Sequence, residues 1–206
     1  MKFKKRRGSS AATPPSFFMK GSQIMNWQEK LLQYQPVNEQ EQQDLASFRY
    51  AFTHFPDVLT RQNPIAHMTV SAFVVNQART HVLMVYHNIY QSWAWTGGHA
   101  DGESDFLAVA LREVQEETGV EAKPVQQEPI SIEQLTVLGH VKKGQYVSEH
   151  LHMNVTYLVE ADDQAALVVC EEENSGVAWI PFDELNTYCR EEHMLPIYNK
   201  IIAQMK

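Results

Sequence analysis

Residues 97–120, GGHADGESDFLAVALREVQEETGV, restrict the fold more than any other part of this chain. Two glycines and a polar turn come first. Apolar residues then recur at the spacing of one helical face: Phe106, Val109, Ala110 and Val114. Ser104 is a suitable N-cap, Asp105 suits the positive end of a helix, and Gly119 lies where a C-cap glycine is expected. The pattern therefore predicts a helix over residues 104–118.

Three glutamates of this predicted helix form an acidic group. At about 100° per residue, Glu113, Glu116 and Glu117 span an arc of about 100°, which we place on the face away from the apolar stripe. Like charges at this spacing repel one another, so solvent or a cation must offset the repulsion. Carboxylates beside a glycine-rich turn suit Mg²⁺ or Mn²⁺. A solvated acidic face is the alternative that the three glutamates by themselves leave open.

The segments around the helix have the patterns of strands. HMTVSAFVVN and HVLMVYH flank the polar turn QART, which predicts a hairpin. SWAWTGG and VAWIPF predict short strands, and LTVLGHVKK and SEHLHMNVTYLVEA predict two strands joined by a turn around Gly144. FDELNTY and LPIYNKIIAQM predict helices near the end of the chain. The sequence thus predicts a mixed α/β fold with one helix inserted between strands.

The residues ahead of this pattern fall into two parts. Residues 1–25 are basic and then rich in Ser, Ala and Pro, which predicts a disordered tail. An organellar transit peptide, or an extension ahead of a native start, stays open for this part. Residues 26–62 predict a helical segment, because Asn26 begins a capping-box pattern and a second helix follows Asn38. We expect residues 63–206 to form the main domain.

Charge and composition limit the function classes. The net charge is −8, and after Met25 the chain carries 11 basic and 25 acidic residues. Such an acidic body argues against a partner that is a nucleic acid. No apolar run approaches the ~18 residues of a membrane span, so we expect no membrane partner. Cys170 and Cys189 lack metal-ligand spacing, which favours a reducing compartment, the cytoplasm.

Residues 97–120 resemble the Nudix box. That motif is a glycine, five residues, a glutamate, seven residues, and then Arg-Glu-apolar-any-Glu-Glu-any-Gly-apolar. REVQEETGV matches its second half at every specified position. In the first half, counting from Gly97 reaches Glu103, but eight residues then separate it from Arg112. Counting from the next glycine places Ser104 at the glutamate. We assign Glu103 to the role, with one extra residue at the start of the helix.

The resemblance covers about residues 65–206 and implies an α/β/α sandwich with a mixed central sheet, here preceded by a short helical appendage. It implies that Mg²⁺ or Mn²⁺ is bound by Glu113, Glu116, Glu117 and a backbone carbonyl near Gly97 or Gly98. It also implies that Arg112 pairs with Glu103. Glu116 can serve as the general base in this family, and a glutamate from a later loop is the alternative, either Glu172 or Glu173.

Nudix enzymes hydrolyse a nucleoside diphosphate linked to another group, by attack of water at phosphorus. We therefore expect a pyrophosphohydrolase acting on a small nucleotide derivative, with a homodimer as one option. A prenyl-diphosphate isomerase is a second hypothesis, but it needs a cysteine near the start of the domain. A non-catalytic nucleotide sensor is a third, although a sensor has no need of three carboxylates.

Several polar residues are candidates for binding the substrate. His150, His152 and Asn154 alternate onto one face of a predicted strand, and His99 follows the glycines of the box. We interpret these four residues, with Glu173, as substrate-binding. A solvent-exposed sheet face or hydrogen-bonded core histidines are the alternatives.

Overall fold

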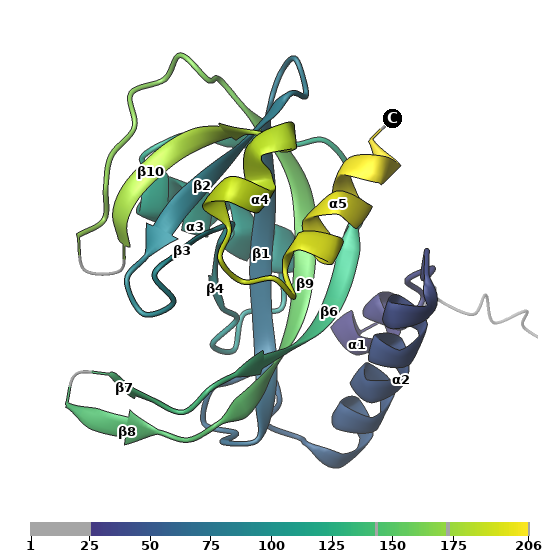
Figure 1. Cartoon of the computed structure of the whole chain (residues 1–206). Coiled ribbons are helices and arrows are strands. Elements are labelled where there is room, and N and C mark those ends of the chain that lie inside the picture. Colours follow the sequence, from purple (N-terminus) through teal and green to yellow (C-terminus); the bar gives the residue numbers. More distant parts are fainter. Residues whose placement is uncertain (1–25, 143, 172–173, 206) are drawn as a thin grey trace, which may run out of the picture.

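The computed structural model describes residues 26–142, 144–171 and 174–205. The predicted tail over residues 1–25 lies outside this part. None of the described helices is long and apolar enough to cross a membrane. In chain order (Figure 1) the elements are α1 (Trp27–Leu31), α2 (Glu39–His54), β1 (Ala66–Asn76), β2 (His81–His87), β3 (Ser92–Ala94), β4 (Thr96–His99), α3 (Phe106–Thr118), β5 (Ala122–Pro124), β6 (Ser131–Val137), β7 (His140–Lys142), β8 (Gln145–Val147), β9 (His150–Ala161), β10 (Asn174–Pro181), the 3-10 helix η1 (Phe182–Glu184), α4 (Leu185–Tyr188) and α5 (Leu195–Gln204).

The strands form a mixed sheet around β1. Its order is β10-β2-β1-β9-β5, while β3 pairs with β2, β4 with β1 and β6 with β9. β1 and β9 run parallel and the other pairs run antiparallel. The predicted β1–β2 hairpin is confirmed by pairing of Val74 with Leu83. β1 is buried along its whole length because neighbours lie on both edges and helices on both faces.

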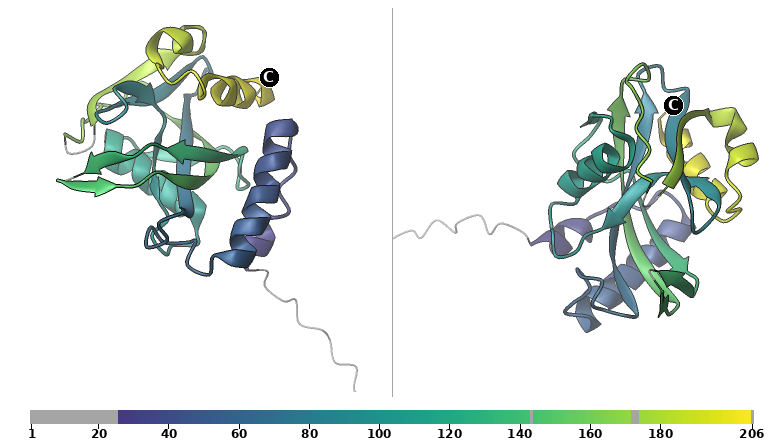
Figure 2. Two further views of the ribbon diagram at one scale, coloured as in Figure 1. Left: turned by 60° about the horizontal axis from the view of Figure 1, so that its bottom comes forward. Right: turned by 90° about the vertical axis from the view of Figure 1, so that its left-hand side faces the viewer.

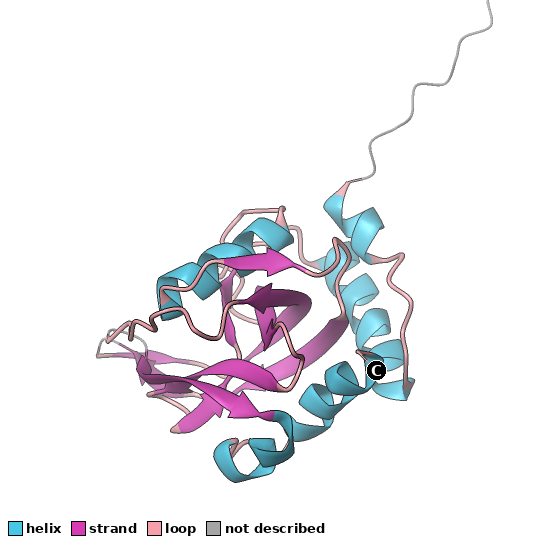
Figure 3. Cartoon of the chain, turned by 90° about the horizontal axis from the view of Figure 1, so that it is seen from above, coloured by secondary structure: helices cyan, strands magenta, loops and turns pink. Residues whose placement is uncertain are grey.

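Two hydrophobic cores lie on opposite faces of the sheet. Val70 of β1 shares one core with Phe48 of α2 and Val109 of α3. Phe73, which points to the other face of β1, packs with Ile201 of α5. Figures 2 and 3 show helices on both sides of the strands. The predicted α/β/α sandwich is therefore confirmed.

The N-terminal helices belong to the same packed body as the sheet. α1 begins with the predicted capping box of Asn26 and Glu29. Glu41 of α2 is fully buried, and its carboxylate lies 2.8 Å from the ammonium of Lys200 on α5. Glu133 of β6 lies 3.4 Å from the same ammonium. An ion-pair cluster of these three residues therefore links the first helices, the sheet edge and the last helix.

The prediction of a single strand over LTVLGHVKK is wrong. β6 ends at Val137, and the chain leaves the main sheet at Leu138, which is 68% exposed. β7 and β8 then form a separate two-stranded hairpin that projects from the body (Figure 1). Gly144 has a φ of +79° in the turn, a conformation that favours glycine. The pairing of β6 with β9 ends at Val137, so the strand stops there although Leu138 is apolar.

Candidate metal and catalytic site

α3 carries the carboxylates of the candidate site. Its N-cap is Asp105, whose carboxylate accepts a hydrogen bond from the Ala108 amide at 3.1 Å. The prediction that Ser104 caps the helix is therefore wrong, because the Ser104 amide is bound by Glu103 at 2.8 Å. Gly119 ends the helix with a φ of +73°, as predicted.

The glycine pair allows β4 and α3 to approach closely. β4 pairs antiparallel with β1, so Gly97 lies opposite Ser71 and Gly98 opposite Val70. A Cβ atom at Gly98 would lie 2.5 Å from the Glu113 carboxylate, and one at Gly97 would lie 2.5 Å from the Val70 carbonyl oxygen. A larger residue at Gly98 would displace the Glu113 carboxylate, and one at Gly97 would collide with the backbone of β1.

The three glutamates have different environments. The side chain of Glu116 is 61% exposed and that of Glu113 is 14% exposed. Glu117 is only 5% exposed, and its carboxylate accepts a hydrogen bond from the Gly97 amide at 3.0 Å. Placing all three on the face away from the stripe is wrong. At 100° per residue Glu117 falls between Phe106 and Ala110 of the apolar stripe, so helical geometry alone already predicted its inward position.

Arg112 joins two of the carboxylates. Its guanidinium nitrogens lie 3.6 Å from a Glu113 oxygen and 3.9 Å from a Glu116 oxygen. The prediction of a direct Arg112–Glu103 ion pair is wrong within the described residues. The Glu103 carboxylate instead accepts hydrogen bonds from the amides of Asp105 and Ser104, which lower its pKa more than Arg112 does. With the extra residue, the Glu103 carboxylate thus binds the backbone amides just before α3 rather than Arg112.

The predicted substrate-binding histidines gather at one end of β1, β4 and β9. His99, His150 and His152 are joined there by His67, whose ring lies 4.8–5.1 Å from the other three rings. Burial, with the charges of the neighbouring histidines, lowers the pKa of His152 to about 2, and burial lowers that of His67. Sequence analysis missed His67 because its pairing with His152 depends on the parallel register of β1 and β9.

Asn154 shares its face with His150 and His152 but is 1% exposed. Its amide oxygen accepts hydrogen bonds from the hydroxyls of Thr69 and Ser71, both at 3.0 Å. Its amide nitrogen donates to Glu133 at 3.0 Å. A substrate contact at Asn154 stays a prediction, and this burial disfavours it.

Glu172 and Glu173, the predicted loop candidates for the general base or substrate binding, lie outside the described residues. Both therefore stay predictions.

Comparisons with known proteins agree on the fold and on the sequence pattern. A rat protein, bis(5'-nucleosyl)-tetraphosphatase [asymmetrical], is 35% identical over 105 residues, which cover 50% of this chain and 64% of that protein. This chain therefore spans less than two thirds of that relative.

Solved structures show the same architecture. A NUDIX-family hydrolase from Clostridium perfringens has a TM-score of 0.51 at 19% identity, covering 68% of this chain and 98% of its own. The E. coli dihydroneopterin triphosphate pyrophosphohydrolase has a TM-score of 0.50 at 13% identity, covering 66% and 95%. At such identities the likeness shows the fold. The sequence pattern of the NUDIX domain, by contrast, matches residues 66–204, which is well over half of the chain. This chain therefore belongs to the Nudix family.

Proposed function

We propose that this protein is a pyrophosphohydrolase that cleaves a phosphoanhydride bond in a nucleoside diphosphate linked to another group, using Mg²⁺ or Mn²⁺. One observation carries the proposal. Glu113 and Glu116 of α3 lie on either side of one guanidinium, and Glu113 packs directly on the glycine strand of the Nudix box. The Glu116 side chain is 61% exposed, so a charged ligand can reach this pair of carboxylates from solvent.

The donor set fits a hard divalent ion. Mg²⁺ is usually held by one or two carboxylates, with water and substrate phosphate oxygens completing its shell. Glu113 and Glu116 supply two carboxylates, while the buried Glu117 fixes the glycine strand through the Gly97 amide. When bound, the metal neutralises phosphate charge and acidifies the attacking water.

The chain's own residues then have distinct roles. Hydrolysis forms a bond from the water oxygen to phosphorus and breaks the phosphoanhydride bond, and a base takes the water proton. Glu116 is the most exposed of the three carboxylates and is our candidate for that base. Arg112 restrains Glu113 and Glu116 and offsets their repulsion. Glu103 orders the turn that leads into α3.

The name of the rat relative favours a dinucleoside tetraphosphate as substrate. The isomerase hypothesis has less support. Cys189 lies in the core on the α5 face, at 4% exposure, where burial raises the pKa of its thiol. A buried thiol with a raised pKa is a poor catalytic group.

A product-release assay tests the proposal. The full chain is incubated with dinucleoside tetraphosphates, nucleoside diphosphate sugars and nucleoside triphosphates, with Mg²⁺, Mn²⁺ or a chelator. We expect metal-dependent release of nucleotide products from at least one class. The proposal is wrong if no class is cleaved with either metal, or if cleavage continues undiminished in the chelator.

A further inference from the structure

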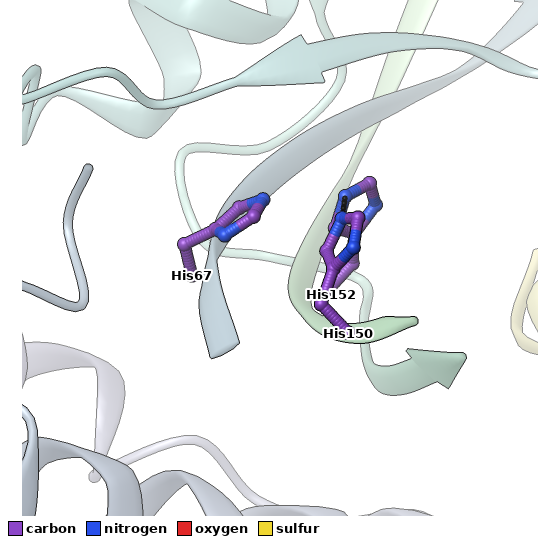
Figure 4. Close-up of side chains that lie close together, drawn as sticks. All are labelled: His67, His150 and His152. Carbon is purple, nitrogen blue, oxygen red and sulfur yellow. Dashed lines mark hydrogen bonds between the residues drawn. The ribbon is translucent and has the colours of Figure 1, made fainter. Parts of the chain in front are cut away.

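Four histidines form a compact group beside the Nudix box. His67 is the second residue of β1, His99 ends β4, and His150 and His152 lie at the start of β9. The His99 and His152 rings are 5.0 Å apart, and the His150 and His152 rings are 5.1 Å apart. Figure 4 shows His67, His150 and His152 facing one another across the two parallel strands.

The ring nitrogens are close enough to share one ion. One nitrogen from each of His67, His150 and His152 lies within 4.8 Å of the other two. The Nε2 atoms of His150 and His152 are 3.2 Å apart. Two nitrogens bound to tetrahedral zinc are about 3.3 Å apart, given Zn–N bonds of about 2.0–2.1 Å. The His150–His152 contact is a hydrogen bond that the ion would replace, with His152 carrying its proton on Nδ1, and the third nitrogen needs a side-chain adjustment.

Backbone carbonyls orient two of the rings for binding. His67 Nδ1 lies 2.9 Å from the Asn63 carbonyl oxygen, and His150 Nδ1 lies 2.8 Å from that of Ser148. A carbonyl only accepts, so both Nδ1 atoms donate, and in the neutral rings Nε2 carries the lone pair. This is the arrangement that orients metal-binding histidines. His67 is 4% exposed, yet its Nε2 has no hydrogen-bond partner among the described residues.

We propose that His67, His150 and His152 bind a borderline divalent cation such as Zn²⁺, at a site separate from the Nudix-box carboxylates. Neutral imidazoles suit Zn²⁺, whereas Mg²⁺ and Mn²⁺ prefer oxygen ligands. The His99 ring lies 5.1 Å from that of His67 and 5.0 Å from that of His152. Arg61 is a nearby cation, and its ion pair with Asp101 offsets part of its charge.

The bound ion has a structural consequence. His67 and His152 are paired residues of β1 and β9, and His150 lies where the chain returns from the β7–β8 hairpin. A cation bound to all three ties the first residues of β9 to β1. It therefore stabilises the end of the sheet that lies next to the glycine strand.

Metal binding can be measured without any enzyme assay. The full chain is stripped with a chelator and titrated with Zn²⁺ against a chromophoric competitor, and Co²⁺ absorption reports the coordination geometry. We expect one equivalent of Zn²⁺ and a rise in melting temperature. His150→Ala removes one of the proposed ligands. Loss of a group that merely orients a ligand costs about tenfold or more in metal affinity, so we expect zinc binding to weaken at least about tenfold.

Two matched variants make the outcome decisive. His140→Ala removes a histidine whose Nδ1 contacts a carbonyl two residues back, as in His150, but which lies outside the cluster, so zinc affinity should not change. Glu116→Gln should also retain the zinc. The inference is overturned if the wild type binds no Zn²⁺, or if His150→Ala binds it as tightly. It is equally overturned if Glu116→Gln, rather than His150→Ala, abolishes binding, since the ion would then occupy the Nudix-box site.

Discussion

The molecule contains two carboxylate clusters that differ mainly in burial. In the first, Glu41 and Glu133 share Lys200, and the three side chains are 0%, 1% and 8% exposed. In the second, Glu113 and Glu116 share Arg112, and these side chains are 14%, 61% and 47% exposed. Both clusters place two acids around one base, so composition alone does not distinguish them.

The difference lies in how each carboxylate is satisfied. Glu41 accepts hydrogen bonds from the Tyr34 hydroxyl at 2.9 Å and the Val37 amide at 2.8 Å, and Glu133 accepts from Asn154 and Thr156. Lone pairs that are already bonded inside the protein are not available to a ligand. Glu116 meets Arg112 at 3.9 Å and its side chain is 61% exposed, which leaves it suited to a cation. We infer that the first cluster serves stability and the second serves chemistry.

The largest expected effect is on the buried cluster. Lys200→Met leaves two buried carboxylates without their cation and should lower the free energy of unfolding by about 3–5 kcal/mol. Chemical denaturation measures this change. The control is Lys30→Met, which breaks an exposed pair with Glu128 at 3.8 Å and should cost at most about 1 kcal/mol. Similar losses in the two variants would show that burial does not separate these ion pairs.

The second effect should appear in turnover rather than stability. Glu116→Gln keeps the side-chain shape and removes the charge, so kcat should fall at least about 100-fold, or about 2.7 kcal/mol in the barrier. The melting temperature should stay within about 2 °C, because Glu116 is largely exposed. Glu121→Gln, an exposed control just beyond α3, should leave both quantities unchanged. Activity of Glu116→Gln within about threefold of wild type would contradict the chemical role.

A third prediction concerns pH. Burial raises the pKa of Glu133 above its ordinary value of 4.5, against the opposing effects of Lys200 and hydrogen bonds. A raised folded pKa contributes stability below pH 4.5, which is lost as the pH rises through the folded pKa. Relative to wild type, the free energy of unfolding of Glu133→Gln should therefore increase above pH 4.5, by at most about 1.4 kcal/mol per pH unit.

Denaturation at several pH values measures that difference. Glu121→Gln, at an exposed site without an ion pair among the described residues, should change the free energy of unfolding by less than about 0.5 kcal/mol. A Glu133→Gln difference that stays constant or falls with rising pH would show that Lys200 outweighs desolvation in this cluster.

The smallest effect lies at the start of α3. Asp105→Ala removes the N-cap and should lower the free energy of unfolding by about 1 kcal/mol. Ser104→Ala should change it by less than about 0.5 kcal/mol, since Ser104 contributes only its amide here. Thermal unfolding of the two variants compares them directly. A larger loss for Ser104→Ala would show that Ser104, as the sequence suggested, is the N-cap of α3.

Much of the fold follows from local sequence patterns. The α3 stripe, the Gly119 C-cap, the capping box at Asn26 and the β1–β2 hairpin are confirmed because each depends on residues a few positions apart. The errors are of two kinds. The start of α3 and the inward position of Glu117 are local details misread from the pattern. The break after Val137 depends on whether a neighbouring strand continues, which is tertiary information.

The sequence by itself determined that this chain carries a Nudix box and that the second half of the box forms a helix rich in carboxylates. Spacing along one helix fixes which of its side chains are neighbours. Only the tertiary structure decided which acids became structural. Glu41, Glu133 and Lys200 lie far apart in the sequence and meet only when α2, β6 and α5 pack. The histidine group depends in the same way on the parallel pairing of β1 with β9, because strand register is set by packing of whole elements.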